Sequence, residues 1–252
     1  MLYLACQWAS GASPTPPANT FSFAPATALI NWTDSGGTHS GNLALFSATA
    51  NIPTVTFVDL SDRGITAISN LSSLPALSVL DISGPNGFTS VDFTGCSSIT
   101  QLFISGNGPQ LSVIDLTGLT GLTYLSCGGG PNTNLDCSVC PSLVYLSSTA
   151  GLLVGLNVTG LTALTYLECY GNQLTALDVH TCSSLVTLQC YSNHLATLNV
   201  TGCTALDTLN CSSNSLTALG VSSCAALTNL VCYLNSITTL DLHTCTALTN
   251  LD

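Results

Sequence analysis

Apolar residues recur with a fixed period of 21 over the C-terminal part of the chain. Four consecutive copies run from residue 164 to residue 247, and each has Leu or Ile at positions 1, 4, 11 and 14, Cys at positions 6 and 19, and Asn at position 9. A period in the twenties indicates a solenoid, in which each copy is one coil and buries its apolar side only against stacked neighbours. We therefore expect no single coil to fold alone.

Counting backwards from Leu164 gives nine complete coils and the start of a tenth at Leu248. The complete coils begin at Val55, Leu77, Ile99, Leu122, Leu143, Leu164, Leu185, Leu206 and Leu227. Most coils have 21 residues, but the coil at Ile99 has 23 and the two before it have 22. Because positions 1, 4, 6 and 9 are echoed at 11, 14, 16 and 19, we expect each half to contribute a short strand to a parallel sheet. The second half is too short and too rich in Thr and Val for a stable helix.

The repeat resembles the leucine-rich repeat family in its short bacterial form, LxxLxCxxNxL followed by LxxLDVxxC. The match in one coil runs through Leu164, Leu167, Cys169, Asn172, Leu174, Leu177, Val179 and Cys182, and it recurs in the next through Leu185, Leu188, Cys190, Asn193, Leu195, Leu198, Val200 and Cys203. The resemblance implies a leucine-rich-repeat solenoid that is nearly all β, with stacked coils and parallel sheets. It also implies a use in binding, without naming a ligand.

The N-terminal part departs from the repeat, and we divide the chain accordingly. Residues 1–19 read as a strand and a Pro-rich linker, residues 20–54 as a hairpin-like β cap, and residues 55–252 as the repeat array. In the cap, FSFAPATALINW alternates as a strand, DSGGTHSGN reads as a turn and LALFSATA as a second apolar run. A solenoid needs such a cap because its first coil otherwise exposes an apolar end and a strand edge.

The composition of the chain limits the kinds of partner that its surface can bind. Charged residues make up 5% of the chain, Arg63 is the single Lys or Arg, and the formal net charge is −11. Nucleic acid and anionic membranes are therefore excluded, since both require clustered basic residues. No apolar stretch is long enough to insert into a membrane. A neutral surface of Ser, Thr, Asn, Gly and Tyr suits a protein or glycan ligand, or self-association, on a cell surface or virion surface.

Thirteen cysteines would ordinarily suggest disulfides or zinc. Eleven of them fall at positions 6 or 19, which face the core, so we expect free thiols that act as small apolar side chains. Stacked coils about 4.8 Å apart exceed the usual Cβ separation of about 3.8 Å in a disulfide. The pair Cys137 and Cys140 also falls on core positions. We expect no metal and no cofactor.

Outward positions of the first half carry the candidate ligand-binding residues. These are Tyr124, Tyr145 and Tyr166 at position 3, Tyr170, Tyr191 and Tyr233 at position 7, and Glu168, Gln189 and Asn210 at position 5. Tyrosine offers a large contact area at low entropic cost and still forms hydrogen bonds, so this face is the candidate site for recognition. The alternative is that the tyrosines only stack along the ladder and stabilise the sheet.

Other columns have simpler interpretations. The Asn residues at position 9, Asn107, Asn172, Asn193, Asn214 and Asn235, should bond the backbone of neighbouring turns. The acidic column at position 15, including Asp92, Asp115, Asp136, Asp178 and Asp241, should repel, bind cations or accept turn hydrogen bonds, the last being favoured. No catalytic motif occurs, so we expect a protein that is not an enzyme.

The two ends support an alternative function. Met1, Tyr3, Leu4 and Cys6 fit positions 1, 3, 4 and 6 of the repeat, and the chain stops at LTNLD, which contains Leu248 and Leu251. A strand donated from residues 1–6 to the C-terminal edge of a neighbouring copy would build a filament head to tail. Two alternatives are a truncated fragment of a longer array and an apolar leader that packs on its own cap. The alternative function is therefore a structural subunit of an extracellular filament, a fibre or a virion lattice.

Overall fold

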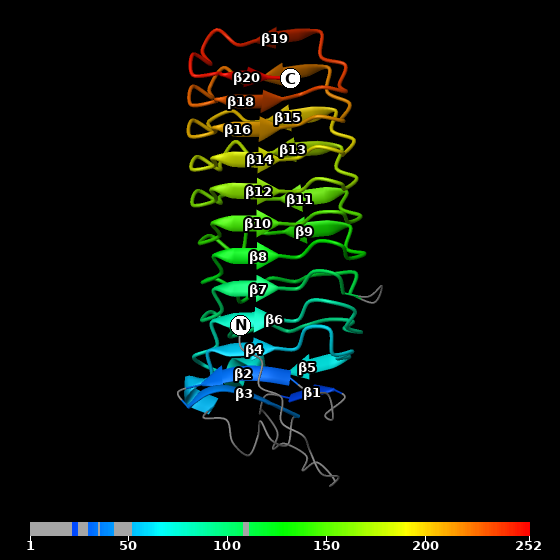
Figure 1. Ribbon diagram of the computed structural model, residues 1–252, viewed down its shortest axis with the longest axis vertical. Coiled ribbons are helices and arrows are strands. Elements are labelled where there is room, and N and C mark those ends of the chain that lie inside the picture. The colour runs from blue at the N-terminus through cyan, green and yellow to red at the C-terminus, as the bar shows by residue number, and fades with distance from the viewer. Residues whose placement is uncertain (1–21, 25–29, 35, 43–51, 108–110) are drawn as a thin grey trace.

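The computed structural model describes residues 22–24, 30–34, 36–42, 52–107 and 111–252. These residues form an elongated stack of coils, with the N-terminal strands at one end and the C-terminal coil at the other (Figure 1). The expected solenoid of stacked coils is confirmed. Two single-turn 3₁₀ helices, η1 (Ile52–Thr54) and η2 (Leu71–Ser73), are the only helical elements among the described residues.

One twelve-stranded sheet runs along the whole stack. Ten of its strands lie at positions 3 to 5 of successive coils and pair in parallel, each apolar position 4 opposite the next. They are β4 (Phe57–Asp59), β6 (Val79–Asp81), β7 (Gln101–Phe103), β8 (Tyr124–Ser126), β10 (Tyr145–Ser147), β12 (Tyr166–Glu168), β14 (Thr187–Gln189), β16 (Thr208–Asn210), β18 (Asn229–Val231) and β20 (Asn250–Leu251). Since successive side chains of a strand point to opposite faces, the buried position 4 leaves positions 3 and 5 outward.

Strands of the second half form two short parallel sheets on the opposite side of the stack. One pairs β9 (Asn134–Asp136) with β11 (Gly155–Asn157), and the other joins β13 (Ala176–Asp178), β15 (Thr197–Asn199), β17 (Ala218–Gly220) and β19 (Thr239–Asp241). The expectation of two strands in every coil was too general, because the coils at Leu77 and Ile99 have no such strand in their described residues.

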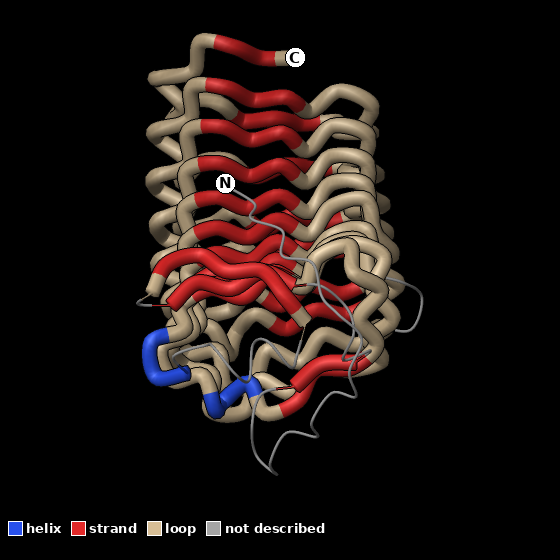
Figure 2. The backbone as a smooth tube through the Cα atoms, turned by 60° about the horizontal axis from the view of Figure 1, so that its bottom comes forward, coloured by secondary structure: helices blue, strands red, loops and turns tan. Residues whose placement is uncertain are grey.

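An N-terminal hairpin caps the first coil. Strands β2 (Ile30–Asp34) and β3 (Gly37–Gly41) pair antiparallel, and β2 also pairs antiparallel with β4, as Figure 2 shows with this end of the stack turned forward. Trp32 is fully buried on the first coil. A third N-terminal strand, β1 (Ser22–Ala24), pairs antiparallel with β5 (Ala67–Ser69) in the second half of the first coil.

The expected β cap is confirmed, but its second strand is not where the sequence placed it. The segment from residue 34 to residue 42 was expected to be a turn, and it contains β3 instead. Gly37 has a φ of 119°, which L side chains rarely adopt, so the chain reverses within a few residues and leaves the rest free to pair. The apolar run at residues 43–50 lies outside the described residues.

Position 9 asparagines join successive coils through their side-chain amides. Asn193 Nδ2 donates to the carbonyl oxygens of Cys169 and Cys190 at 3.0 and 3.1 Å, and its Oδ1 accepts from Leu174 N–H at 3.1 Å. Each such amide therefore bonds its own coil and the preceding one. Asn86 plays the same role in the 22-residue coil at Leu77, where it bonds Leu60 O and Ile65 N.

Twelve cysteines lie within the described residues, and all of them are free. All are buried except Cys232, which is half-buried. Position 19 thiols also donate to the position 16 carbonyl oxygen of the preceding coil, for example Cys203 Sγ to Val179 O at 3.3 Å. These cysteines therefore act as weak hydrogen-bond donors as well as apolar side chains.

Candidate functional site

The outward tyrosines of the long sheet form two stacks. In the position 3 column, the ring centroids of Tyr124 and Tyr145 lie 4.4 Å apart at 2°, and those of Tyr145 and Tyr166 lie 4.9 Å apart at 6°. In the position 7 column, Tyr170 and Tyr191 stack at 4.5 Å and 7°. Because parallel strands repeat the same residue at each step, one tyrosine per coil is enough to bring the rings into contact.

Two details of this arrangement were not expected. Phe103 lies against the end of the first stack, with its ring centroid 5.1 Å from that of Tyr124 and its plane tilted by 40°. Phe103 lies at position 5 of its coil, two residues along the strand from position 3. The residues at position 3 alone therefore do not reveal its contact with Tyr124. Tyr233 belongs to neither stack, because Ser212 occupies position 7 in the coil between Tyr191 and Tyr233, and the Tyr233 side chain is 47% exposed.

Position 5 places polar side chains between the two tyrosine columns. Glu168 accepts a hydrogen bond from Tyr166 Oη at 2.9 Å and one from Tyr145 Oη at 3.4 Å. Burial, together with the hydrogen bond to Glu168 and its negative charge, raises the pKa of Tyr166 above its ordinary value. Both hydroxyls therefore stay protonated and donate to the carboxylate.

The next two coils continue this line with amides. Gln189 and Asn210 follow Glu168 in register at position 5. Asn210 Oδ1 accepts from Ser212 N–H at 3.1 Å and from Ser212 Oγ at 2.7 Å, so its oxygen is bound within its own turn. We call the six tyrosines together with Glu168, Gln189 and Asn210 the tyrosine face.

The carboxylates at position 15, on the opposite side of the stack, accept hydrogen bonds from the turns that follow them. This confirms the interpretation as turn hydrogen bonds, which the sequence favoured. Asp136 Oδ1 accepts from the Ser138 backbone and hydroxyl at 3.0 and 2.6 Å, and Thr117 N donates to Asp115 Oδ1 at 2.9 Å. Hydrogen bonds from Thr117 lower the pKa of Asp115. Among the described residues no group of three or more His, Cys, Asp and Glu side chains could hold a metal ion.

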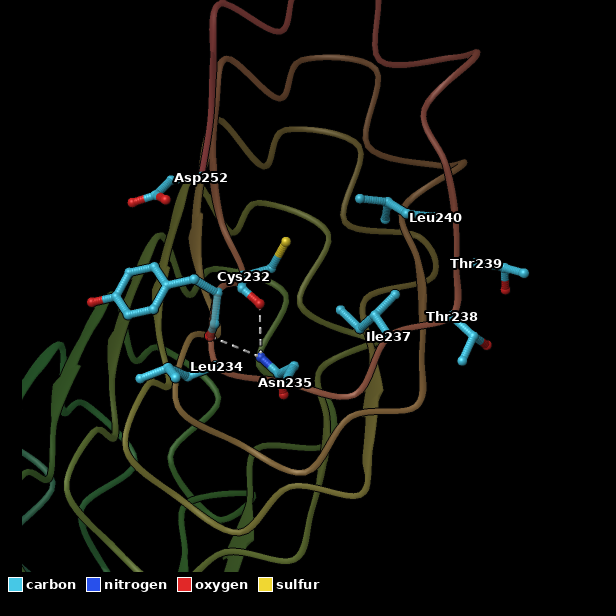
Figure 3. A pocket seen from close by; sticks show the side chains of 9 residues that line it. Cys232, Leu234, Asn235, Ile237, Thr238, Thr239, Leu240 and Asp252 are labelled. Atoms are coloured by element: carbon cyan, nitrogen blue, oxygen red, sulfur yellow. Dashed lines mark hydrogen bonds between the residues drawn. The ribbon is translucent and has the colours of Figure 1, made fainter.

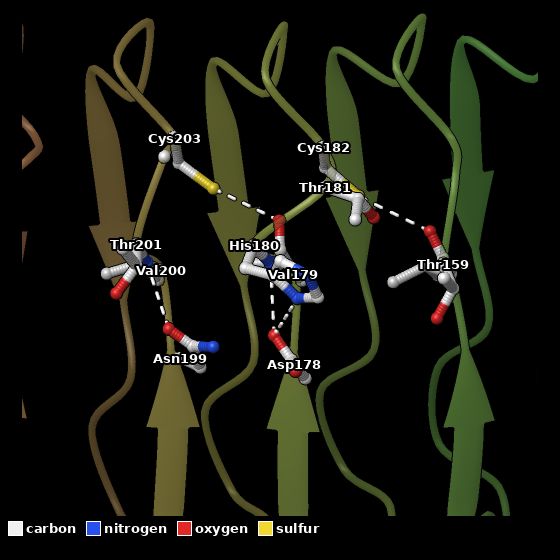
Figure 4. A network of polar contacts seen from close by, with 12 residues as sticks. Thr159, Asp178, Val179, His180, Thr181, Cys182, Asn199, Val200, Thr201 and Cys203 are labelled. Atoms are coloured by element: carbon white, nitrogen blue, oxygen red, sulfur yellow. Dashed lines mark hydrogen bonds and ion pairs between the residues drawn. The ribbon is translucent and has the colours of Figure 1, made fainter.

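Two histidines of the opposite side pair with this column, which the sequence did not suggest. His180 Nδ1 lies 2.8 Å from Asp178 Oδ1, and His243 Nδ1 lies 2.7 Å from Asp241 Oδ1. Figure 4 shows the first pair beside the turn bond that Asn199 makes with Thr201 in the next coil. The spacing of two residues from Asp to His, repeated in two coils, is the signal that could have found these pairs.

Known structures place this architecture in a family. No family model matches the sequence, and no curated protein matches it. The functional domain of InlJ from Listeria monocytogenes, whose structure includes a cysteine ladder, superposes with a TM-score of 0.56 and 30% sequence identity over 84% of this chain and 50% of that chain. Both proteins thus combine stacked coils with a column of cysteines. The chain is a leucine-rich repeat protein.

Two more distant structures share the leucine-rich repeat fold. TLR13 in its complex with ssRNA13 superposes with a TM-score of 0.63 and 21% identity, over 82% of this chain and 33% of that chain. The plant peptide hormone receptor RGFR1 in complex with RGF2 gives 0.55 and 19%, over 72% of this chain and 33% of that one. The present chain spans half or less of the length of these three structures.

The predicted assembly site has one half at each end of the chain. The structure describes the C-terminal half, which contains Leu248 and Leu251. Strand β20 pairs with β18, Leu248 packs partly buried against the core, and Leu251 is 52% exposed. A pocket beside them (Figure 3) is lined by Cys232, Tyr233, Leu234, Asn235, Ile237, Thr238, Thr239, Leu240 and Asp252. Met1, Tyr3, Leu4 and Cys6 lie outside the described residues, so strand exchange stays a prediction.

Among the described residues, no helix has the length and apolar character needed to cross a bilayer.

Proposed function

We propose that this leucine-rich repeat protein is a non-enzymatic recognition module that binds a partner protein through the tyrosine face. The observation that carries the proposal is the pair of tyrosine stacks on the outward side of one continuous sheet. Stacked rings are already ordered before a ligand arrives, so little side-chain entropy is lost on binding. The same stacks also stabilise the sheet, and the two roles are compatible.

The arrangement of the rings favours a protein over a glycan. Within each stack a ring covers the face of its neighbour, so Tyr145 has a tyrosine on both sides. A sugar ring packs against a free aromatic face, whereas a polypeptide also uses ring edges and hydroxyl groups. Nucleic acid, present in the TLR13 structure, is disfavoured here because the chain carries one Lys or Arg and a net charge of −11.

We place the module on a cell surface or a virion surface. Its low charge and its outward Ser, Thr, Asn and Tyr side chains support contact with other macromolecules rather than catalysis. The similar fold of a peptide hormone receptor supports the same role.

The test replaces tyrosines with a residue that the array already tolerates. Ser212 occupies position 7, so a variant with Tyr170→Ser, Tyr191→Ser and Tyr233→Ser should keep the fold. Purified protein is applied to an array of extracellular protein domains and to a glycan array. We expect the wild type to bind a protein spot and the variant to lose at least about tenfold in affinity, as for the loss of aromatic anchor residues.

The matched control carries Thr197→Ala, Thr217→Ala and Thr239→Ala on the opposite side of the stack, where Ala holds the same position in an adjacent coil. This control should bind as the wild type does. Equal binding by the tyrosine variant would contradict the proposal. Binding confined to glycan spots, and lost in the tyrosine variant, would replace the protein ligand with a glycan.

A further inference from the structure

The two tyrosine stacks meet in a single coil, the one that begins at Leu164. The first stack ends there with Tyr166, whose partner in the next strand is Thr187. The second stack begins there with Tyr170, and Thr149 holds position 7 in the preceding coil. Each of these two rings therefore has a stacked tyrosine on one side and no aromatic column neighbour on the other.

Glu168 lies between these two rings and is the only glutamate in the chain. Its carboxylate is half-buried and accepts bonds from the hydroxyls of Tyr145 and Tyr166. A carboxylate offers about four acceptor positions, so these two bonds leave capacity on both oxygens. Residues 111–252 contain no Lys or Arg, and two of the three histidines of this segment, His180 and His243, pair with aspartates on the opposite side.

Other carboxylates at position 5 have different hydrogen-bond partners from those of Glu168. Asp59 accepts from the backbone and hydroxyl of Ser61 and from Asn31 Nδ2, and Asp81 accepts from the backbone and hydroxyl of Ser83. These shorter side chains fold back onto the following turn. Glu168 is one methylene longer and contacts the tyrosine hydroxyls instead, which leaves a negative charge in the middle of an aromatic face.

We propose that Glu168, with the rings of Tyr166 and Tyr170 beside it, is the subsite for a cationic side chain, Lys or Arg, of the partner protein. This inference rests on the proposed function and names the chemistry that the tyrosine face recognises. The carboxylate takes charge-assisted hydrogen bonds from the ammonium or guanidinium group. The open faces of Tyr166 and Tyr170 point toward opposite neighbouring coils, so one of these rings at a time attracts the cation through its negative face. The net charge of −11 draws a basic segment toward this surface.

The experiment uses a short capped peptide of repeating Gly-Ser-Arg and a second peptide in which neutral citrulline replaces each arginine. Binding to the full chain is followed by NMR titration at physiological ionic strength. The wild type should bind the arginine peptide, with shifts centred on residues 164–191, and should not bind the citrulline peptide. Glu168→Gln should raise the Kd by about tenfold, the scale of one charge-assisted contact, because the variant keeps the tyrosine rings.

The control separates this subsite from the general acidity of the chain. Asp178→Asn removes one negative charge from the opposite sheet, where Asn157 and Asn199 already occupy the same position. Glu168→Gln is equally well matched, because Gln189 holds that position in the next coil. Both variants should melt like the wild type, and Asp178→Asn should keep the Kd within about twofold, as for a screened distant charge.

Two results would overturn the inference. One is equal weakening by Glu168→Gln and Asp178→Asn, which would mean that binding follows net charge alone. The other is a wild type that does not bind the arginine peptide at all. The proposed function and the cationic subsite fail separately: an array ligand that is lost with the three tyrosines but kept by Glu168→Gln would retain recognition through the tyrosine face and remove the cationic subsite.

Discussion

At the residue scale, the repeat depends on side chains that satisfy the backbone of two coils at once. Asn193 has a donor group and an acceptor group on one short side chain, and it bonds Cys169 O, Cys190 O and Leu174 N. An apolar residue in place of Asn193 would leave the Leu174 N–H without a partner inside the stack, while Cys169 O and Cys190 O would each keep one bond, from Asn172 and Asn214. Buried polar groups that lose a hydrogen bond destabilise a fold more than a formed bond stabilises it.

We predict that Asn193→Ala lowers the free energy of unfolding by about 1–3 kcal/mol, because the buried Leu174 N–H loses its partner and two carbonyl oxygens each lose one of their bonds. The matched control is Asn199→Asp, since Asp178 holds the same position in the preceding coil and accepts the same kind of turn bond. Urea unfolding followed by circular dichroism measures both. A stability of Asn193→Ala equal to that of the control would show that the Asn ladder is dispensable.

The buried thiols give a pH dependence at the same scale. Burial raises the pKa of Cys127 and Cys169 to about 12, from an ordinary value of 9.0. Below pH 9 these thiols are neutral in the folded and the unfolded chain, so their contribution to stability is fully present. As the pH rises from 9 toward 12, the unfolded chain ionises first and the contribution is lost.

We therefore predict that the free energy of unfolding is level between pH 7 and pH 8 and falls above pH 9. Urea titrations in the presence of a reductant measure it. Because burial also raises the pKa of Tyr145 and Tyr166, the tyrosines add a loss of the same sign at higher pH. A variant with Cys127→Ala and Cys169→Ala keeps the tyrosine contribution, and its decline should be shallower. An identical slope in both proteins would contradict the thiol account.

At the element scale, the short strands are stabilised by side chains that recur at the same position in successive coils. Each strand has three residues or fewer in the array, too few to be stable alone, and the ladder is held by position 4 in the core and by position 3 outside. Tyr145 is the clearest case because it stacks on Tyr124 and on Tyr166. Tyr233, which has no stacked partner and is 47% exposed, is its natural comparison.

We predict that Tyr145→Ala destabilises the protein by about 2 kcal/mol more than Tyr233→Ala, since an aromatic pair contributes about 0.5–1.5 kcal/mol beyond area burial and two pairs are lost. Tyr145→Phe should recover most of the difference because it keeps both stacks. Thermal and urea unfolding of the three variants test this. If Tyr145→Ala and Tyr233→Ala were equally stable, the stacks would contribute little to the sheet.

The elements also show why some features could be predicted and others not. The strands at positions 3 to 5 could be predicted from the apolar residues at positions 1 and 4, such as Leu164 and Leu167, because every coil repeats this spacing. The strand β3 lacks alternating apolar residues and is fixed by its pairing with β2, a contact that the local sequence does not encode. Phe103 joins a stack diagonally across two columns. The sequence indicated the tyrosine columns of the candidate site, but the hydroxyl bonds to Glu168 depend on side-chain conformations.

At the scale of the whole molecule, a solenoid is a row of units that contact only their neighbours, so its stability is a sum of local interfaces. A change at one end should therefore leave the other end intact. The N-terminal end is closed by the hairpin, where Trp32 is fully buried and pairs with Val58 of β4 across the antiparallel edge. Asn31 Nδ2 adds a hydrogen bond to Asp59 Oδ2 at 3.0 Å.

We predict that Trp32→Ala loosens the cap and the first coils without unfolding the array. Truncation of a fully buried Trp removes about 3–5 kcal/mol of local stability. Hydrogen exchange should lose protection at the amides of β4 and β6, while the amides of β14 and β16 exchange as in the wild type. Asp241→Asn at the far end serves as control and should leave exchange in the first coils unchanged. Uniform loss of protection along the whole stack would instead mean that the coils unfold as one cooperative unit, and the nearest-neighbour description would be wrong for this protein.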